Sequence, residues 1–328
     1  MAIQLTIIGL GQIGTSVGLA LANQQNLLRR VGNDLELKIA RQAEKMGAVD
    51  QVEVNLPKAV RNADLVLLCL PIDQIRETME LIAPDLKENA VVMDTAPFKE
   101  VVASWASQHL PNGRHYVGLT PVLNPEYLYE AGSGIDAAHA DLFRGGLMAI
   151  VAPPQANSQA IKLATDLTGL LGSTPFFADL LEIDGLMTAT HLLPQLMASA
   201  LLNATTEQPG WREARKVAGR AYAEVSGPAA RLDQAQTLAA SALLNQANVL
   251  RVLDNAITAL SAIRTDIEAQ DEKTLLERLR RAQSGRVKWW KERHSGDWTD
   301  EVASTVEMPE NPGLFGRMFG MGRKPKPK

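Results

Sequence analysis

Cysteine is almost absent from this sequence, since its 328 residues include only Cys69. A single cysteine excludes an intramolecular disulfide framework, and no group of cysteines and histidines has the spacing of metal ligands. Cys69 lies in the apolar run 65–70. A buried structural thiol is therefore expected there rather than a nucleophile.

Long apolar runs and a large excess of one charge are also lacking. No run approaches the roughly 20 apolar residues of a membrane span, and no charged leader or signal sequence precedes the first predicted strand. The composition is 46% hydrophobic and 21% charged, with a net charge of −4, which does not favour nucleic acid as a partner. We expect a soluble cytoplasmic protein, and its length allows two domains.

Glycine, in contrast, recurs at short intervals near the start of the chain. The apolar run 5–8 predicts a strand buried on both faces, and Gly9, Gly11 and Gly14 follow it before a helical stretch. In this spacing the first glycine permits a tight turn, the second allows close approach of a pyrophosphate, and the third lets helix and strand pack closely. Gln12 and Ile13 complete a helix N-terminus whose free N–H groups would face the phosphates.

An acidic residue stands where a dinucleotide site requires one. Residues 28–34 read as a second strand that ends in Asp34, twenty positions after Gly14. A carboxylate there would accept the ribose hydroxyls of NAD and repel the 2′-phosphate of NADP, so NAD is the expected cofactor and NADP the less favoured one. The alternative is that Asn33 or Asp34 caps a helix over residues 35–46, ahead of Gly47.

Strands and helices then alternate along the chain, which is typical of a doubly wound, mostly parallel α/β sheet. Ligands bind such sheets beyond the carboxyl ends of the strands. The predicted ends, beside the glycine loop and Asp34, are Leu70–Pro71, Thr95 and Thr120.

After residue 178 the pattern becomes entirely helical. The predicted segments are Leu180–Leu202, Trp211–Val225, Pro228–Ile267 and Glu272–Lys291. Helices that are apolar around much of their surface need partners on several sides, and a homodimer would supply them. We therefore expect a dinucleotide domain over residues 1–178, a helical substrate and dimerisation domain over 179–294, and a disordered tail over 295–328.

Several further motifs, taken with the glycine loop, resemble one enzyme family over roughly residues 4 to 285. They are Val31-Gly32-Asn33-Asp34, Ala63-Asp64 through Pro71, Asp94-Thr95 with Lys99, Tyr116-Val117-Gly118 with Pro121, Leu142-Phe143 with Gly145, and Asp184 ahead of His191-Leu192-Leu193-Pro194. This ensemble resembles the prephenate/arogenate dehydrogenases of tyrosine biosynthesis. The resemblance implies an N-terminal Rossmann-type domain and a C-terminal all-helical dimerisation domain. It also implies oxidation of prephenate or arogenate with NAD(P), in which hydride transfer from a ring carbinol is coupled to loss of carbon dioxide.

Four positions depart from the family pattern at the reacting centre. Pro97 stands where the family has a serine, and Thr120 where a histidine hydrogen-bonds the ring hydroxyl. Counting from Asp184 and Pro194 places the family's second histidine on Leu192, one position after His191. Gly227 occupies the position of an arginine that binds a substrate carboxylate.

Three residues remain as candidates for catalysis. Thr120 either bonds a substrate hydroxyl or ends a strand structurally. His191 has the pKa range of a base, with Gln195 one turn away to orient it, or else it packs or caps. Arg231 replaces the missing arginine if a helix begins with Ser226 as its N-cap and Pro228 at its first position; a solvent-facing salt bridge is the alternative.

The sequence thus predicts an NAD-dependent dehydrogenase with altered catalytic residues. The alternatives are a dehydrogenase for a different substrate and a non-catalytic, regulatory dinucleotide-binding protein.

Overall fold

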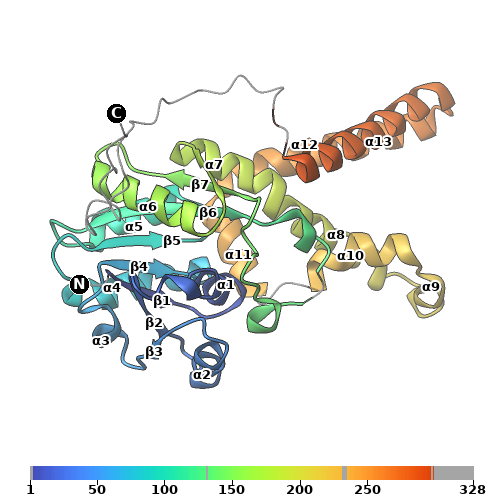
Figure 1. Ribbon diagram of the computed structural model, residues 1–328. Coiled ribbons are helices and arrows are strands. Elements are labelled where there is room, and N and C mark those ends of the chain that lie inside the picture. Colours follow the sequence, from blue (N-terminus) through green and yellow to red (C-terminus); the bar gives the residue numbers. More distant parts are fainter. Residues whose placement is uncertain (1–2, 131, 231–234, 297, 299–328) are drawn as a thin grey trace, which may run out of the picture. The chain divides into compact units, whose positions relative to one another are not determined.

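Figure 1 shows the computed structural model of the protein, which describes residues 3–130, 132–230, 235–296 and 298. The chain divides into two compact units, residues 1–249 and residues 250–328. The boundary expected after residue 178 lies within the first unit and stays a prediction.

One eight-stranded sheet forms the centre of the first unit, with the strand order β3-β2-β1-β4-β5-β6-β7-β8 (Figure 1). The strands are β1 Ile3–Ile8, β2 Leu28–Asn33, β3 Gln51–Val52, β4 Leu65–Leu68, β5 Val91–Asp94, β6 His115–Val122, β7 Leu147–Val151 and β8 Thr174–Phe177. All neighbouring strands are parallel except β6 and β7. The winding reverses between β1 and β4, so the predicted doubly wound α/β sheet is confirmed.

The central strands are apolar because both of their faces are covered. Every residue of β1, β4 and β5 is buried. Strands buried on both faces lose the alternation of apolar and polar residues, which is why these runs are continuous in the sequence.

Helices alternate with the strands along the chain, and only helices come after β8 within the described residues. Those of the first unit are α1 Gln12–Ala20, α2 Leu37–Lys45, α3 Leu56–Val60, α4 Ile72–Ile82, α5 Glu100–His109, α6 Ser158–Leu170, α7 Leu180–Met187, α8 Leu193–Thr206, α9 Trp211–Val217, α10 Arg220–Ala230 and α11 Ala235–Leu244. The helix α12, Gln246–Glu268, begins in this unit and continues into the next.

The predicted helix over residues 35–46 begins later than expected. Its N-cap is Glu36, which makes no side-chain cap, so the capping interpretation of Asn33 and Asp34 is wrong. Asn33 Nδ2 donates to the Glu53 carbonyl at 2.7 Å, and Asp34 bonds both the glycine loop and the N–H of Glu36, ahead of the first helical residue. The predicted end is correct, since Gly47 follows α2 with a φ of +79°, a conformation that favours glycine.

The long helices predicted after residue 178 are interrupted. A π-helix, Thr188–Leu192, separates α7 from α8, α9 ends before Ala218, and a break at Asn245 separates α11 from α12. Pro228 lies inside α10, so the helix start predicted at Ser226 is wrong. The Ser226 hydroxyl instead donates to the Tyr222 carbonyl at 2.7 Å, a bond within the preceding turn.

The second unit contains the rest of α12 and the helix α13, Glu272–Ser295. Asp271 caps α13 by accepting from the Thr274 N–H at 3.0 Å, and Arg278 pairs with Asp266 of α12 at 2.7 Å. Of the tail predicted over 295–328, only residues 295, 296 and 298 are described, and the remainder lies outside the described residues.

Candidate functional site

The glycine loop between β1 and α1 has the geometry that its spacing predicts. Gly9 has a φ of +89°, and a Cβ there would collide with the Cys69 carbonyl. A Cβ on Gly14 would collide with the Gly9 carbonyl, so α1 starts in close contact with the loop. Around Gly11, in contrast, the space is open to 4 Å. The loop thus leaves room beside the N-terminus of α1, where a pyrophosphate would accept hydrogen bonds.

Asp34 lies at the carboxyl end of β2 and contacts the loop directly. Its Oδ2 accepts from the Leu10 N–H at 2.7 Å, and its Oδ1 accepts from the Glu36 N–H at 2.9 Å. A carboxylate has about four acceptor positions, so two backbone bonds leave capacity for ribose hydroxyls. Next to it, Leu35 is 91% exposed.

The other predicted cofactor residues follow the neighbouring strands at the same edge of the sheet. The Cys69 N–H donates to the Ile8 carbonyl at 2.8 Å, and the Thr95 N–H donates to the Leu68 carbonyl at 3.0 Å. The Leu70 side chain lies against Gly9, and Pro71 is the N-cap of α4. The structure therefore brings Gly9–Gly14, Asp34, Leu70, Pro71 and Thr95 together, and these residues fit a dinucleotide.

Thr120 has an unusual environment on β6. It is 1% exposed, and its Oγ1 has no hydrogen-bond partner among the described residues. It pairs with Ala149 of β7, and Ala149 packs in the cluster that contains Ile183 and Met187 of α7. Opposed side chains in an antiparallel pair share a face, so Thr120 lies on the face that α7 covers. A buried hydroxyl without a partner costs free energy unless a ligand supplies one.

His191 follows α7 in the π-helix, one turn beyond Met187. It is exposed, whereas Leu192 is only 1% exposed. A π-helix turn holds about one residue more than an α-helix turn, and this turn, Thr188–Leu192, contains both His191 and Leu192. Of the two neighbours, it is His191 and not Leu192 that a ligand can reach.

The His191 ring makes no hydrogen bond within the described chain. The residue is partly accessible to solvent, but the surrounding protein atoms exclude much of the water around the ring. This desolvation lowers the pKa of His191 below its usual value. The predicted orienting role of Gln195 is wrong, because its Nε2 donates to the His191 carbonyl at 2.9 Å instead of the ring.

A buried polar network, which the sequence did not predict, lies on the same face of the sheet. Asp94 accepts from Lys99 Nζ at 2.6 Å and from the Tyr116 hydroxyl at 2.7 Å. Asp184 accepts from the backbone N–H groups of Lys99 at 2.5 Å and Glu100 at 3.2 Å. The Lys99 side chain lies over Gly118, two residues before Thr120. The network fixes the start of α5 and α7 at the edge where Thr120 lies.

Burial sets the protonation of this network. Desolvation lowers the pKa of Lys99, although the charge of Asp94 opposes the shift, and it raises the pKa of Tyr116 well above its usual value. Desolvation also raises the pKa of Asp184 to about 6 against the effect of its backbone bonds. Burial likewise raises the pKa of Cys69 to about 12, so this thiol stays protonated at neutral pH.

Two further positions bear on the predicted substrate site. Arg231 lies outside the described residues, so its role stays a prediction. Gly227 lies in α10, and a Cβ there would meet open space.

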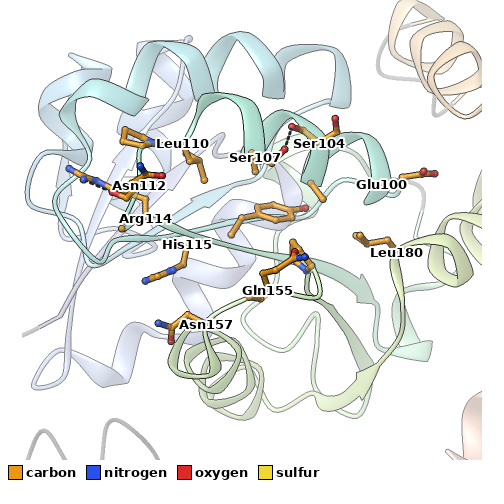
Figure 2. A pocket seen from close by; sticks show the side chains of 17 residues that line it. Glu100, Ser104, Ser107, Leu110, Asn112, Arg114, His115, Gln155, Asn157 and Leu180 are labelled. Carbon is orange, nitrogen blue, oxygen red and sulfur yellow. Dashed lines mark hydrogen bonds between the residues drawn. The ribbon is translucent and has the colours of Figure 1, made fainter.

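A hollow of about 540 Å³ lies along α5. Figure 2 shows the side chains that line it. Glu100 and Leu180 lie at one end of it, and Asn112 and Arg114 lie at the other. None of the described site residues predicted from the sequence lines this hollow. It does not correspond to the cofactor site, which lies at the carboxyl ends of the strands.

The described ranges contain no group of side chains suited to hold a metal ion. Every helix in them is too short or too polar to cross a bilayer. The predicted cytoplasmic location stays a prediction.

Comparison with known proteins agrees with this arrangement. Residues 17–174 match the nucleotide-binding domain of prephenate dehydrogenase, and residues 182–281 match its dimerisation domain. The chain is 28% identical over 291 residues to the cyclohexadienyl dehydrogenase of Zymomonas mobilis, which covers 86% of this chain and 94% of that protein. It is 24% identical over 322 residues to the prephenate dehydrogenase of Bacillus subtilis, covering 94% of this chain and 81% of that one.

A solved structure shows the same fold. The prephenate dehydrogenase of Aquifex aeolicus, in complex with hydroxyphenyl propionate and NAD⁺, superposes with a TM-score of 0.77 at 19% identity. The superposition covers 88% of this chain and 98% of that chain. With both matched domains in the expected order, the chain belongs to the prephenate/arogenate dehydrogenase family and is an NAD(P)-dependent dehydrogenase of the prephenate dehydrogenase type.

Proposed function

We propose that this protein oxidises prephenate or arogenate with NAD as the hydride acceptor and releases carbon dioxide. The observation that carries the proposal is the buried, unpartnered hydroxyl of Thr120. It stands on β6, whose carboxyl end lies at the same sheet edge as the glycine loop. A ring hydroxyl of the substrate would supply the hydrogen bond that Thr120 lacks.

The cofactor residues favour NAD. When bound, NAD accepts the hydride from the ring carbinol, and the protein positions the two reactants. The open space at Gly11 admits the pyrophosphate beside Gln12 and Ile13. Asp34 would accept hydrogen bonds from the ribose hydroxyls, and its charge would disfavour the 2′-phosphate of NADP. Leu70, Pro71 and Thr95, at the carboxyl ends of the neighbouring strands, would contact the rest of the bound dinucleotide.

His191 is the proposed base for the ring hydroxyl. Its lowered pKa keeps the imidazole neutral near pH 7, and a neutral imidazole accepts a proton. The hydroxyl proton passes to His191 as the C–H bond of the carbinol breaks. The bond between the ring and its carboxylate then breaks, its electron pair enters the ring as carbon dioxide leaves, and the phenolate oxygen of the aromatic product takes up a proton.

The four positions that we expect to depart from the family pattern bear on the expected rate. Leu192 is buried, so the base must come from His191. Pro97 and Gly227 offer no side-chain hydrogen bond, and Arg231 is the proposed partner of a substrate carboxylate. Loss of the usual carboxylate partner at Gly227 would weaken substrate binding unless Arg231 replaces it. We therefore propose turnover below that of relatives with the full set of residues.

A homodimer is the proposed assembly, consistent with the matched dimerisation domain. Large apolar side chains on α12 are more than half exposed in the single chain, at Leu250, Ile257, Leu260 and Ile267. Intervals of seven and three residues place them on one helix face, as in the seam between packed helices. A partner subunit would bury this seam.

Steady-state assays with prephenate and with arogenate, each with NAD and with NADP, test the proposal. We expect NADH formation with at least one substrate, accompanied by carbon dioxide. Tight NAD binding without turnover on either substrate would favour the non-catalytic interpretation. No binding of either cofactor would contradict the proposal entirely.

A further inference from the structure

The connection between β6 and β7 reaches back to α1, the helix that begins at the glycine loop. Gln12 Nε2, in the first turn of α1, donates to the Ala137 carbonyl at 3.0 Å. The His139 backbone N–H donates to Ser16 Oγ at 3.0 Å, and Ser16 is fully buried. Two hydrogen bonds thus tie residues 137–139 to the helix whose N-terminus would bind the phosphates.

The segment that makes these bonds is well packed. Ile135, Ala137, Leu142 and Phe143 are all buried. Buried apolar side chains fix the position of a connection that would otherwise move over the surface. The residues that make the two bonds to α1 are therefore held in place by packing.

The side chain of His139 contacts two residues that follow β6, Tyr127 and Glu130. Its ring stacks on Tyr127 with centroids 4.3 Å apart and planes 15° apart, and its Nε2 lies 2.7 Å from Glu130 Oε1. Tyr127 donates to Asp141 at 2.6 Å. This bond raises the pKa of Tyr127 to about 12, so the hydroxyl stays a donor at neutral pH.

Tyr127 and Glu130 belong to the stretch that follows Thr120. The link is continued by Asn124, whose N–H donates to the Leu142 carbonyl at 2.8 Å. His139 therefore contacts α1 with its backbone, and with its ring it contacts Tyr127 and Glu130, which follow β6.

We propose that His139 is a positioning residue that couples the cofactor site to the substrate site by holding the start of α1 to the chain that follows Thr120. This inference rests on the proposed function. When a dinucleotide fixes α1, the bonds through Ser16 and His139 also fix residues 124–130. The substrate then binds to an end of β6 that is already in place, and each ligand strengthens the binding of the other.

The test measures the Kd of NAD⁺ by calorimetry with and without saturating hydroxyphenyl propionate, the ligand of the Aquifex complex. We expect the wild-type Kd to fall at least about 5-fold in the presence of hydroxyphenyl propionate, the lower end of common coupling. His139→Ala should bring this ratio close to one. Ser16→Ala, which removes only the acceptor of the His139 N–H, should reduce the ratio as well. His139→Phe, which keeps the stack on Tyr127, should give an intermediate value.

Gln42→Ala is the matched control. Gln42 donates to Asp136 at 3.0 Å on the exposed side of the same connection, and its loss should leave the ratio at the wild-type value. A purely structural role would lower the thermal midpoint of His139→Ala without changing the ratio.

A wild-type ratio near one, an unchanged ratio in both His139→Ala and Ser16→Ala, or an equal loss in Gln42→Ala would overturn the inference alone. Should His139→Ala fail to fold, Ser16→Ala and His139→Phe decide the matter. Wild-type protein that does not bind NAD⁺ would overturn the proposed function and this inference together.

Discussion

The hydroxyl of Thr120 has no hydrogen-bond partner among the described residues, and its proposed role is to bind the substrate. Replacing it by Val keeps the shape of the side chain and removes the unpartnered oxygen. Because a buried unsatisfied group costs about 1 to 3 kcal/mol, Thr120→Val should leave the free energy of unfolding unchanged or raise it. Turnover of prephenate or arogenate should fall by about 10-fold or more, the value of one lost hydrogen bond at a reacting group.

Urea titration and initial rates on the same preparation separate the two effects. Loss of stability together with full activity would show that Thr120 is a structural strand-end residue.

Asp34 bonds the glycine loop and is proposed to bind the ribose, and different substitutions separate these two roles. Asp34→Asn keeps an oxygen that accepts the Leu10 N–H but removes the charge, whereas Asp34→Ala loses both. We expect wild-type protein to bind NAD at least about tenfold more tightly than NADP, because the carboxylate repels a 2′-phosphate. Asp34→Asn should narrow this difference by strengthening NADP, and Asp34→Ala should weaken both cofactors.

Calorimetric titration of both cofactors against all three proteins gives the answer. Equal affinities of the wild type for NAD and NADP would show that Asp34 does not discriminate between the two cofactors.

At the residue scale, local spacing predicted some features and missed others. The turn at Gly9, the close start of α1 at Gly14 and the position of Asp34 follow from a few neighbouring residues. The bond from Lys99 to Asp184 spans 85 positions, and no local pattern reports such a contact. His191 shows the same limit, because its exposure depends on a π-helix that α-helical spacing cannot predict.

At the scale of elements, Asp184 of α7 accepts hydrogen bonds from the backbone at the start of α5. The contribution of this carboxyl group to the free energy of unfolding depends on pH. Its pKa is about 6 in the folded protein and near 3.8 when unfolded. The folded state therefore holds this proton more tightly, and stability falls as pH rises from about 4 to about 6. The shift corresponds to about 2 to 3 kcal/mol for this one group.

The difference between the pH profiles of wild type and Asp184→Asn isolates this contribution. Urea midpoints from pH 4 to pH 8 should show a wild-type decrease over that interval that the variant lacks. Parallel profiles would mean that Asp184 ionises normally in the folded protein.

The elements themselves were largely predictable, and their breaks were not. Apolar runs predicted β1, β4 and β5, and Gly47 predicted the end of α2, because these signals are local. Pro228 predicted a helix start but lies within α10. Packing against neighbouring segments decides whether a proline begins a helix or is tolerated inside one.

For the whole molecule, the α12 seam predicts assembly. Ile257→Glu and Leu260→Glu would each place a charge in the proposed interface, where an unpaired buried charge is strongly unfavourable. We expect light scattering to give about twice 35.5 kDa for the wild type and a mass near 35.5 kDa for each variant at micromolar concentration. Asn255→Glu, on another face of α12, is the control and should stay dimeric. A monomeric wild type would contradict the proposed homodimer.

The proposed reaction is the oxidation of a cyclohexadienol acid with His191 as the base. The most direct measurement is the initial rate of NAD reduction with prephenate and with arogenate, for wild type, His191→Asn and Gln195→Ala. Gln195→Ala removes a bond to the His191 backbone and leaves the ring in place.

We predict measurable wild-type turnover that falls at least about 100-fold in His191→Asn, as for a lost general base, and stays within a few-fold in Gln195→Ala. Rapid turnover by His191→Asn, or no turnover by the wild type with either substrate, would contradict the account.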